Sequence, residues 1–287
     1  MKKILITGSL GFIGHHLLNA LRGANFQIFE CNRSNGDLTL EISWENIEKC
    51  DYVIHLAGKS SIPDSWEDIH GFINNNINIT VNVLNYCKQN NSKLIILSTY
   101  LYGNPLKLPI DELSETYTNN PYALSKRFSE ELCKFYSDNF GVKITILRPF
   151  NVYGIGQSNK FLIPSLITQI LNGSSILIKD LEPKRDYVYI DDLIDSIIKS
   201  LSLDNQFEII NIGSGSSYSV KEIIDIIQYK CNKNLQINTS NERRQNEVMN
   251  TVADINKAYK LLNWAPKISI HEGIELIINS NKALYAK

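Results

Sequence analysis

The sequence lacks the features that mark several broad classes of protein. Its apolar runs are far shorter than the ~18 residues of a membrane-spanning helix. With 15 glycines and 8 prolines in 287 residues, it is neither collagen-like nor of low complexity. The 29 basic and 30 acidic side chains give a formal net charge of −1, which leaves no electrostatic footprint for nucleic acid or an anionic membrane. We therefore expect neither of these partners.

Cysteine is scarce, and its spacing suggests neither a disulfide framework nor a metal site. The five cysteines form no C-x-x-C pair and are widely scattered, at positions 31, 50, 87, 133 and 231. This pattern is typical of reduced, mostly buried thiols in a cytoplasmic protein. The apolar run Ile4–Ile6 after Lys2 and Lys3 is much shorter than the ~7–15 residues of a signal-peptide core, so no signal peptide is predicted.

Apolar runs alternate along the chain with stretches of helical spacing. Hydrophobic residues make up 43% of the sequence, enough to form a core that offsets the cost of ordering the backbone. The predicted strands are residues 3–7, 26–29, 51–56, 93–98, 141–147, 185–190 and 207–212; the predicted helices are 14–21, 76–87, 122–140, 161–171 and 220–229. The alternation predicts an α/β fold with a doubly wound parallel sheet covered by helices on both faces.

A glycine-rich turn joins the first predicted strand to the first predicted helix. Gly8, Gly11 and Gly14 have the spacing G-x-x-G-x-x-G. Glycines allow the backbone to approach a pyrophosphate closely, and the helix N-terminus supplies free N–H groups and a positive dipole end. In this strand–turn–helix context the turn predicts a dinucleotide-binding site.

The end of the second predicted strand indicates which dinucleotide binds. A carboxylate at this point would bind the ribose 2′-hydroxyl of NAD. The spacing places Asn32 there, followed by Arg33, which suits a 2′-phosphate and favours NADP over NAD; a slip in register would place Glu30 there instead. Asp37 and Leu38 have the pattern of a pair that flanks the adenine.

A serine, a tyrosine and a lysine form the candidate catalytic group. Tyr122 and Lys126 are four residues apart, which places them on one face of a helix. A nearby ammonium lowers the pKa of a phenol, so Tyr122 is a candidate general acid/base. Ser98 ends the fourth predicted strand, where its hydroxyl could stabilise a carbonyl oxygen that gains negative charge.

These motifs, in this order, resemble those of the extended short-chain dehydrogenases/reductases, in the nucleotide-sugar-modifying group of the NAD-dependent epimerase/dehydratase family. The resemblance covers nearly the whole chain. The matching segments are TGSLGFIG from residue 7, HLAG from 55, NINITVN from 76, STYLYG from 98, NPYALSK from 120, RPFNVYG from 148, RDYVYIDD from 185, NIG from 211, AD from 253 and LNWAP from 262.

The resemblance implies roles for further residues. Tyr122 and Lys126 would contact the cofactor, as would the residues of the glycine turn and of the second strand's end named above. The further cofactor contacts that the resemblance implies are Phe12, Ile13, Leu56, Ala57, Gly58, Asn76 and Pro149. It implies substrate contacts from Ser98, Thr99, Tyr100, Tyr122, Asn151, Arg185 and Arg244, with Arg243 as the alternative register for Arg244. Of these, Asn151 and Arg185 would contact the substrate diphosphate, which a guanidinium fork suits well.

The resemblance also implies a two-part architecture. Residues 1–154 plus about 185–215 would form a Rossmann NAD(P)-binding domain, and 155–184 plus about 216–287 a smaller nucleotide-sugar-binding domain. The strand at 185–190 is expected to join the main sheet. Members of the family often form homodimers through the helix that carries the tyrosine and lysine. Phe128, Leu132, Phe135 and Tyr136 could serve such a surface or the core.

Departures from the family pattern narrow the reaction. Dehydratases of this group carry an Asp–Glu pair after the catalytic hydroxyl residue, where this chain has Thr99 and Tyr100. The missing acid at Asn32 and the short loop after it resemble NADPH-using reductases, which convert a nucleotide-linked 4-keto-6-deoxyhexose to a 6-deoxyhexose. The alternatives are an NAD-dependent nucleotide-sugar 4-epimerase and a catalytically silent, cofactor-binding regulator.

Overall fold

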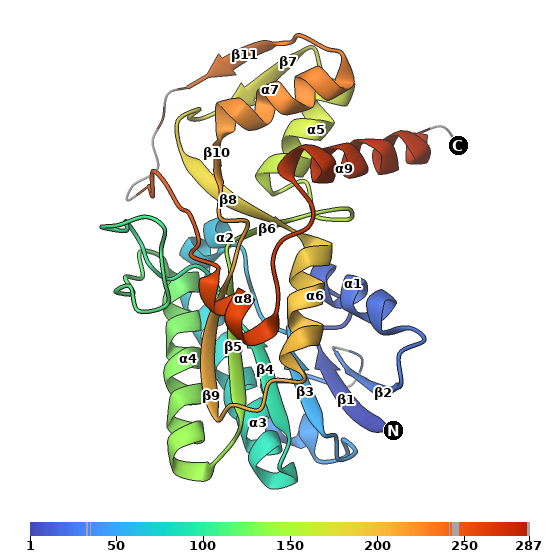
Figure 1. Cartoon of the computed structure of the whole chain (residues 1–287), viewed down its shortest axis with the longest axis vertical. Helices are drawn as coiled ribbons and strands as arrows, with labels where there is room; N and C mark the ends of the chain where they lie inside the picture. The colour runs from blue at the N-terminus through green and yellow to red at the C-terminus, as the bar shows by residue number, and fades with distance from the viewer. Residues whose placement is uncertain (33, 35, 241, 243–246, 286–287) are drawn as a thin grey trace.

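The computed structural model describes residues 1–285 except 33, 35, 241 and 243–246. Its centre is a sheet of parallel strands, seen in the lower part of Figure 1. The strand order is β2 (Phe26–Cys31), β1 (Lys2–Thr7), β3 (Tyr52–His55), β4 (Lys93–Leu97), β5 (Ile144–Pro149) and β9 (Phe207–Ile212). The order reverses between β1 and β3, and ligands of doubly wound sheets bind beyond the carboxyl ends of the strands at such a point. The expected α/β fold is confirmed.

Helices cover both faces of this sheet, and successive apolar residues of each strand point alternately into the two cores. Ile4 and Ile6 of β1 belong to the core under α1 (Phe12–Leu21) and α6 (Ile190–Ser200). Leu5 belongs to the core under α3 (Ile69–Asn90) and α4 (Pro121–Phe140). Successive side chains of a strand point to opposite faces, so a continuous apolar run fills both cores. The short helices η2 (Glu41–Trp44) and α2 (Ile62–Glu67) lie in the connections around β3.

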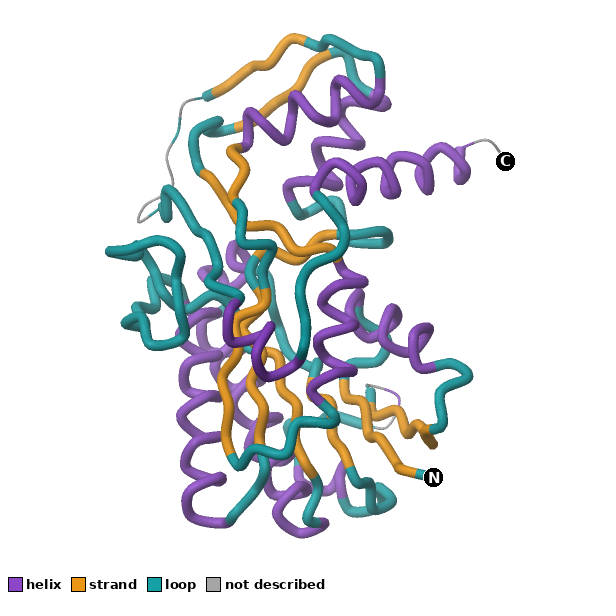
Figure 2. Tube along the Cα trace, in the orientation of Figure 1, coloured by secondary structure: helices purple, strands orange, loops and turns teal. Residues whose placement is uncertain are grey.

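The rest of the chain forms a second part above the carboxyl ends of the strands (Figure 2). It contains a sheet of β10 (Ser217–Ser219), β8 (Lys184–Tyr189) and β6 (Asn151–Tyr153), and a pair of β11 (Gln236–Thr239) and β7 (Ser175–Ile178). Its helices are α5 (Leu162–Asn172), α7 (Val220–Cys231) and α9 (Ile270–Tyr285), while α8 (Asn256–Leu262) packs against β9 and α6. The α1–α6 core continues into this part, since the same buried cluster contains Leu166 and Ile223.

One expected strand pairing is wrong. The strand predicted at 185–190 forms as β8, but it pairs with β6 and β10 instead of joining the main sheet. The place beside β5 is taken by β9, in the register Ile144↔Phe207. An apolar run indicates a buried strand without specifying its neighbour, so the sequence could not distinguish the two sheets.

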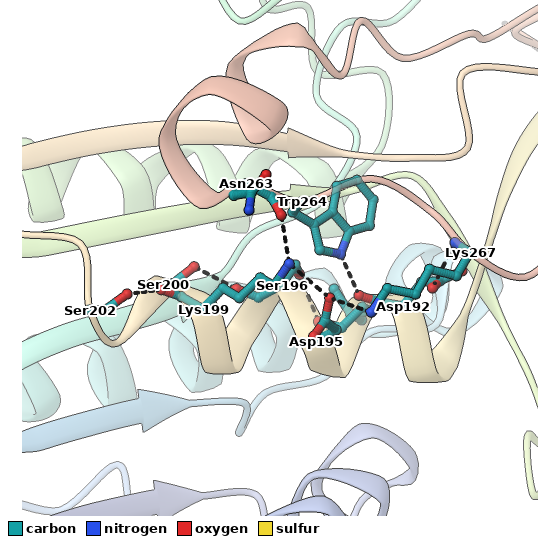
Figure 3. A network of polar contacts seen from close by, with 10 residues as sticks. Asp192, Asp195, Ser196, Lys199, Ser200, Ser202, Asn263, Trp264 and Lys267 are labelled. Atoms are coloured by element: carbon teal, nitrogen blue, oxygen red, sulfur yellow. Dashed lines mark hydrogen bonds and ion pairs between the residues drawn. The ribbon is translucent and has the colours of Figure 1, made fainter.

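A polar network attaches the segment after α8 to α6 (Figure 3). Trp264 is fully buried, and its Nε1 donates to the Asp192 carbonyl oxygen over 2.9 Å. The Asp192 carboxylate accepts the backbone N–H groups of Lys267 and Ile268, each at 3.0 Å. Thus the acidic start of α6 and the tryptophan of the LNWAP segment form one structural joint.

Burial agrees with what the sequence predicted for the cysteines. Four are buried and one is partly buried; in that order they are Cys31, Cys50, Cys87, Cys133 and Cys231. Within the described residues, no helix has the length and apolar character needed to cross a membrane.

Candidate active site

The glycine turn after β1 brings two backbone segments into close contact. Gly8 has a φ of +74°, and a Cβ there would lie 2.6 Å from the Ala57 nitrogen. A Cβ on Gly14 would lie 2.3 Å from the Gly8 carbonyl oxygen, so neither position has room for a side chain. Gly11 is the N-cap of α1 and provides no capping side chain, while Phe12 and Ile13 form the first turn. The helix therefore presents its first N–H groups and positive dipole end to a ligand.

The end of β3 is tied to this turn by a buried histidine. Thr7 Oγ1 accepts the Ala57 N–H at 3.2 Å and lies 2.7 Å from His55 Nδ1. Burial, together with the charge of Lys126, lowers the pKa of His55 to about 3. His55 is therefore neutral and orients the Leu56–Gly58 segment. The HLAG match marked this segment, but the sequence did not assign a role to His55.

Asn32 lies directly beyond β2, next to the glycine turn. Its Nδ2 donates to Ser9 Oγ at 3.2 Å, and Gly8 N–H donates to the Cys31 carbonyl at 3.1 Å. Glu30 is exposed and pairs with Ile6 in the parallel register, one position before the Thr7↔Cys31 pair. The described geometry therefore places Asn32, rather than Glu30, at the strand tip. Arg33 lies outside the described residues.

Asp37 and Leu38 form a local turn after β2. The Asp37 carboxylate accepts from both the backbone N–H and the hydroxyl of Thr39, which holds the pKa of Asp37 below its usual value. The carbonyl of the buried Leu38 accepts from the indole of Trp44 and the amide of Asn82, each at 3.0 Å. Side chains of η2 and α3 thus fix this turn.

Asn76 is buried and has several partners within the protein. Its Oδ1 accepts the Lys59 N–H at 2.8 Å, and its Nδ2 donates to the Lys59 carbonyl and to Ser125 Oγ. The side chain therefore locks the Gly58–Lys59 turn onto α4. A direct contact of Asn76 with a cofactor stays a prediction.

Ser98 and Lys126 meet at the carboxyl end of β4. The Ser98 side chain is buried, and among the residues that the structure describes its Oγ is one of the few buried polar atoms with no hydrogen-bond partner. Lys126 Nζ donates to the carbonyl oxygen of Leu97, the residue before Ser98, at 2.7 Å. Burial lowers the pKa of Lys126 to about 8.

Tyr122 starts α4, where Asn120 caps the helix and Pro121 occupies its first turn. A hydrogen bond from Thr99 favours the phenolate, but burial dominates and raises the pKa of Tyr122. The expected lowering by Lys126 is therefore wrong for this structure. The direction is decided by depth of burial, which helix spacing does not reveal, and the charge of Lys126 is not among the causes of the shift. Tyr122 is thus protonated at neutral pH, the state from which a general acid donates, while its raised pKa makes it a weaker acid than a free phenol.

An aromatic ring lies beside the tyrosine, and this ring lines a cavity. Phe72 lies edge-on to Tyr122, with ring centroids 6.5 Å apart. A cavity of about 510 Å³ opens beside Phe72, with Lys59 and Lys160 among its lining residues. Sequence reasoning missed Phe72, because a single aromatic residue in a predicted helix gives no functional signal.

The predicted substrate residues lie at the junction with the second part. Asn151, at the start of β6, donates from Nδ2 to the Asp186 carbonyl at 3.0 Å, while Pro149 is buried at the end of β5. Arg185 of β8 pairs with the Glu247 carboxylate and donates to the Val248 carbonyl.

Of the other predicted substrate residues, Tyr100 has a hydrogen-bond partner within the protein, whereas Arg244 is not described. Tyr100 donates from its hydroxyl to the Gly103 carbonyl at 2.6 Å, and burial raises its pKa. Arg244 and its alternative Arg243 lie outside the described residues. Sequence reasoning missed Glu247 as the partner of Arg185, because the two are 62 positions apart.

The residues present fit a nicotinamide dinucleotide. Gly11 leaves the first turn of α1 uncapped by a side chain, and the glycines allow close backbone approach. At the other end of the site, the unpartnered hydroxyl of Ser98 can bond a reacting oxygen. Among the residues that the structure describes, no group of three or more histidine, cysteine or carboxylate side chains could hold a metal ion.

The chain belongs to the NAD dependent epimerase/dehydratase family, whose model matches residues 4–213. A putative UDP-glucose 4-epimerase of Methanocaldococcus jannaschii is 32% identical, over 96% of this chain and 97% of its own. The GDP-6-deoxy-D-mannose reductase of Pseudomonas aeruginosa is 27% identical, over 97% and 96%. The structure of RMD from Pseudomonas aeruginosa complexed with NADPH superposes with a TM-score of 0.91 and 26% identity, covering 99% of this chain and 100% of that one. The relatives of this chain thus include both nucleotide-sugar reductases and nucleotide-sugar epimerases.

Proposed function

We propose that this protein catalyses the NADPH-dependent reduction of the 4-keto group of a nucleotide-linked 4-keto-6-deoxyhexose, giving a nucleotide 6-deoxyhexose. The observation that carries the proposal is the state of the acid/base residues. Among the described residues, the buried Ser98 hydroxyl has no hydrogen-bond partner, and the adjacent Thr99 side chain is hydrogen-bonded to Tyr122. This arrangement suits the donation of a hydrogen bond and a proton to one oxygen.

Each residue then has a defined role. The bound reduced nicotinamide supplies the hydride that C4 of the sugar receives. Tyr122 gives its phenolic proton to the C4 oxygen, and the Ser98 hydroxyl stabilises that oxygen while its negative charge develops. Lys126, which is held against the end of β4 by its hydrogen bond to the Leu97 carbonyl, binds the nicotinamide ribose.

Further residues would hold the two ligands. The pyrophosphate of the cofactor would lie on the N-terminus of α1, and Asn32 would face its adenosine ribose. The substrate diphosphate would bind Asn151 and Arg185, with Thr99 and Tyr100 nearer the sugar. Residues 1–154 and about 185–215 would carry the cofactor, and 155–184 and about 216–287 the nucleotide sugar.

A panel of 4-keto-6-deoxy nucleotide sugars with NADPH and NADH tests the proposal, followed by the fall in absorbance of the reduced nicotinamide. We expect turnover with at least one sugar and a preference for NADPH. The proposal fails if no member of the panel is reduced.

A second candidate is a nucleotide-sugar 4-epimerase, which the 32% identity to a putative UDP-glucose 4-epimerase favours. An enzyme of this kind oxidises and re-reduces C4 with NAD that stays bound. NAD that copurifies with the protein, together with epimerisation without added NADPH, would establish this alternative.

We also propose a homodimer in the cytoplasm. Phe128 and Phe135 lie on α4 with 37% and 54% of their surface exposed, whereas Leu132 and Tyr136 pack against the core. The exposed pair supports a dimer through α4, which sedimentation of the wild-type and Phe135→Glu proteins would test. The buried thiols are compatible with a reducing compartment.

A further inference from the structure

A buried guanidinium connects the two elements that carry the acid/base residues. Arg148 of β5 is 4% exposed, and Glu130 of α4 is 8% exposed. Arg148 Nε donates to Glu130 Oε1 at 2.9 Å and Nη2 donates to Oε2 at 2.5 Å, which forms a two-pronged ion pair. The third group, Nη1, donates to the Tyr102 hydroxyl at 2.8 Å.

Each end of this bridge leads to a different part of the site. Glu130 lies one turn beyond Lys126 and two turns beyond Tyr122 on the same helix. Tyr102 ends the turn that begins at Ser98, and its hydroxyl donates to Asn211 Oδ1 of β9 at 2.7 Å. Arg148 and Asn211 are themselves paired residues of β5 and β9.

We propose that Arg148 is a positioning residue that fixes the Ser98 turn relative to the Tyr122 helix, by binding Tyr102 on one side and Glu130 on the other. This inference rests on the proposed roles of Ser98 and Tyr122. A planar guanidinium holds Glu130 in a two-pronged pair and Tyr102 through a separate nitrogen. A lysine has three donors on one ammonium at the end of a flexible stem, so it cannot hold both partners in this fixed geometry. A buried ion pair gives little net stability compared with apolar side chains of similar size, so stability alone does not account for it.

Steady-state kinetics of Arg148→Lys, Tyr102→Phe and the apolar double variant Arg148→Met/Glu130→Leu test this role. Catalysis is sensitive to small displacements of its groups, so we expect kcat to fall by about tenfold or more in Arg148→Lys and in the double variant. The KM for the sugar and the Kd for NADPH should stay within about twofold of wild type, since Arg148 is buried, its guanidinium is bonded to Glu130 and Tyr102, and it is not among the proposed ligand contacts. Tyr102→Phe should lower kcat by a smaller factor, with a modest fall in melting temperature because the lost hydroxyl bonds both Arg148 and Asn211.

The double variant separates positioning from packing. If it folds with a wild-type melting temperature and also recovers wild-type kcat, the pair serves only to fill the core and the inference is overturned. If it does not fold, Tyr102→Phe decides alone, because it removes a single hydroxyl; an unchanged kcat in that variant overturns the inference. Lys134→Met, which removes an exposed ion pair to Asp138 on the same helix, is the matched control and should change neither the melting temperature nor kcat.

The inference and the proposed function can fail separately. If wild-type enzyme epimerises sugars instead of reducing them, the same variants should lower the epimerase kcat, since that reaction would use the same Ser98 and Tyr122. If wild-type enzyme turns over neither substrate, crystal structures of the wild-type and Arg148→Lys proteins provide a readout independent of activity. A changed distance between Ser98 Oγ and the Tyr122 hydroxyl supports the inference, and an unchanged distance overturns it.

Discussion

Lys126 Nζ donates a 2.7 Å hydrogen bond to the carbonyl oxygen of Leu97, the residue directly before Ser98. This bond joins α4 to the carboxyl end of β4, so the lysine four residues after Tyr122 also anchors the strand that precedes Ser98. Burial lowers the pKa of Lys126 to about 8, close enough to neutrality for its charge to be lost in mildly alkaline solution. Titration of Lys126 should therefore affect the contact between α4 and the end of β4.

The rate of reduction should depend on this charge. We expect kcat to fall as pH rises through about 8, where Lys126 becomes neutral. An arginine stays charged throughout this range, so Lys126→Arg should have a lower kcat without that alkaline decline. Rate profiles from pH 6 to 10 would measure both; an identical decline in the two enzymes would show that another group titrates.

Stability should respond to the same titration in the opposite sense. Folding lowers the pKa of Lys126 from 10.5 to about 8, so the unfolded chain binds more protons between these values. Stability rises with pH wherever the unfolded state binds more protons. The penalty for burying the charged lysine is thus complete below pH 8 and is relieved towards pH 10.5. Consequently, the stability gained by Lys126→Met should be larger at pH 7 than at pH 10, as urea denaturation would measure.

Tyr122→Phe should abolish turnover while leaving cofactor binding near normal. The variant removes only the hydroxyl, which is the proposed proton donor, and general acid catalysis contributes about 10²–10⁴-fold to a rate. Single-turnover kinetics and NADPH fluorescence titration measure the two properties separately. Loss of NADPH binding would show that Tyr122 has been assigned the wrong role.

Ser98→Ala should lower kcat without destabilising the protein. Removal of one stabilising donor costs about 10²–10³-fold in kcat. The Ser98 hydroxyl has no partner, so the alanine leaves no broken bond behind. Ser125→Ala is the matched control: its hydroxyl accepts from Asn76 and donates to the Tyr122 carbonyl, so we expect a stability loss of about 1 kcal/mol. Equal losses of stability in the two variants, measured by urea denaturation, would contradict this.

Some of the site followed from the sequence because local rules determine it. Strand ends and helical spacing are local properties, and they located Gly8 and Ser98 at the ends of β1 and β4 and Tyr122 and Lys126 on α4; in the structure Gly8 and Ser98 directly follow those strands. The parallel sheet followed in the same way from alternating strands and helices, and membership of the family agrees with it.

The remaining features depend on contacts between distant parts of the chain. Local sequence does not specify that β8 pairs with β6 or that Arg185 faces Glu247. Depth of burial is equally non-local, which is why the direction of the pKa shift of Tyr122 was predicted wrongly. Such properties emerge only when the two parts of the molecule pack together.

The Trp264–Asp192 joint should be a major source of stability. Truncating a fully buried large aromatic residue costs about 3–5 kcal/mol, so Trp264→Ala should lower the free energy of unfolding by that amount. Trp264→Phe keeps much of the apolar volume but loses the hydrogen bond to Asp192, and its loss should be smaller. Guanidinium denaturation would measure both; equal losses would show that the indole N–H, rather than the volume, is decisive.

Asn32 should set the choice between NADPH and NADH. It lies at the tip of β2, where a carboxylate would accept hydrogen bonds from the ribose hydroxyls of NADH but repel the 2′-phosphate of NADPH. Asn32→Asp should therefore raise the KM for NADPH and lower that for NADH, changing the ratio of kcat/KM values by about tenfold or more, equivalent to about 1.4 kcal/mol. Glu30→Gln is the matched control, since Glu30 is exposed and lies before the tip. If wild-type enzyme binds NADH at least as tightly as NADPH, the preference proposed for NADPH is wrong. If Glu30→Gln changes the ratio and Asn32→Asp does not, the residue that contacts the adenosine ribose is Glu30, two positions before Asn32.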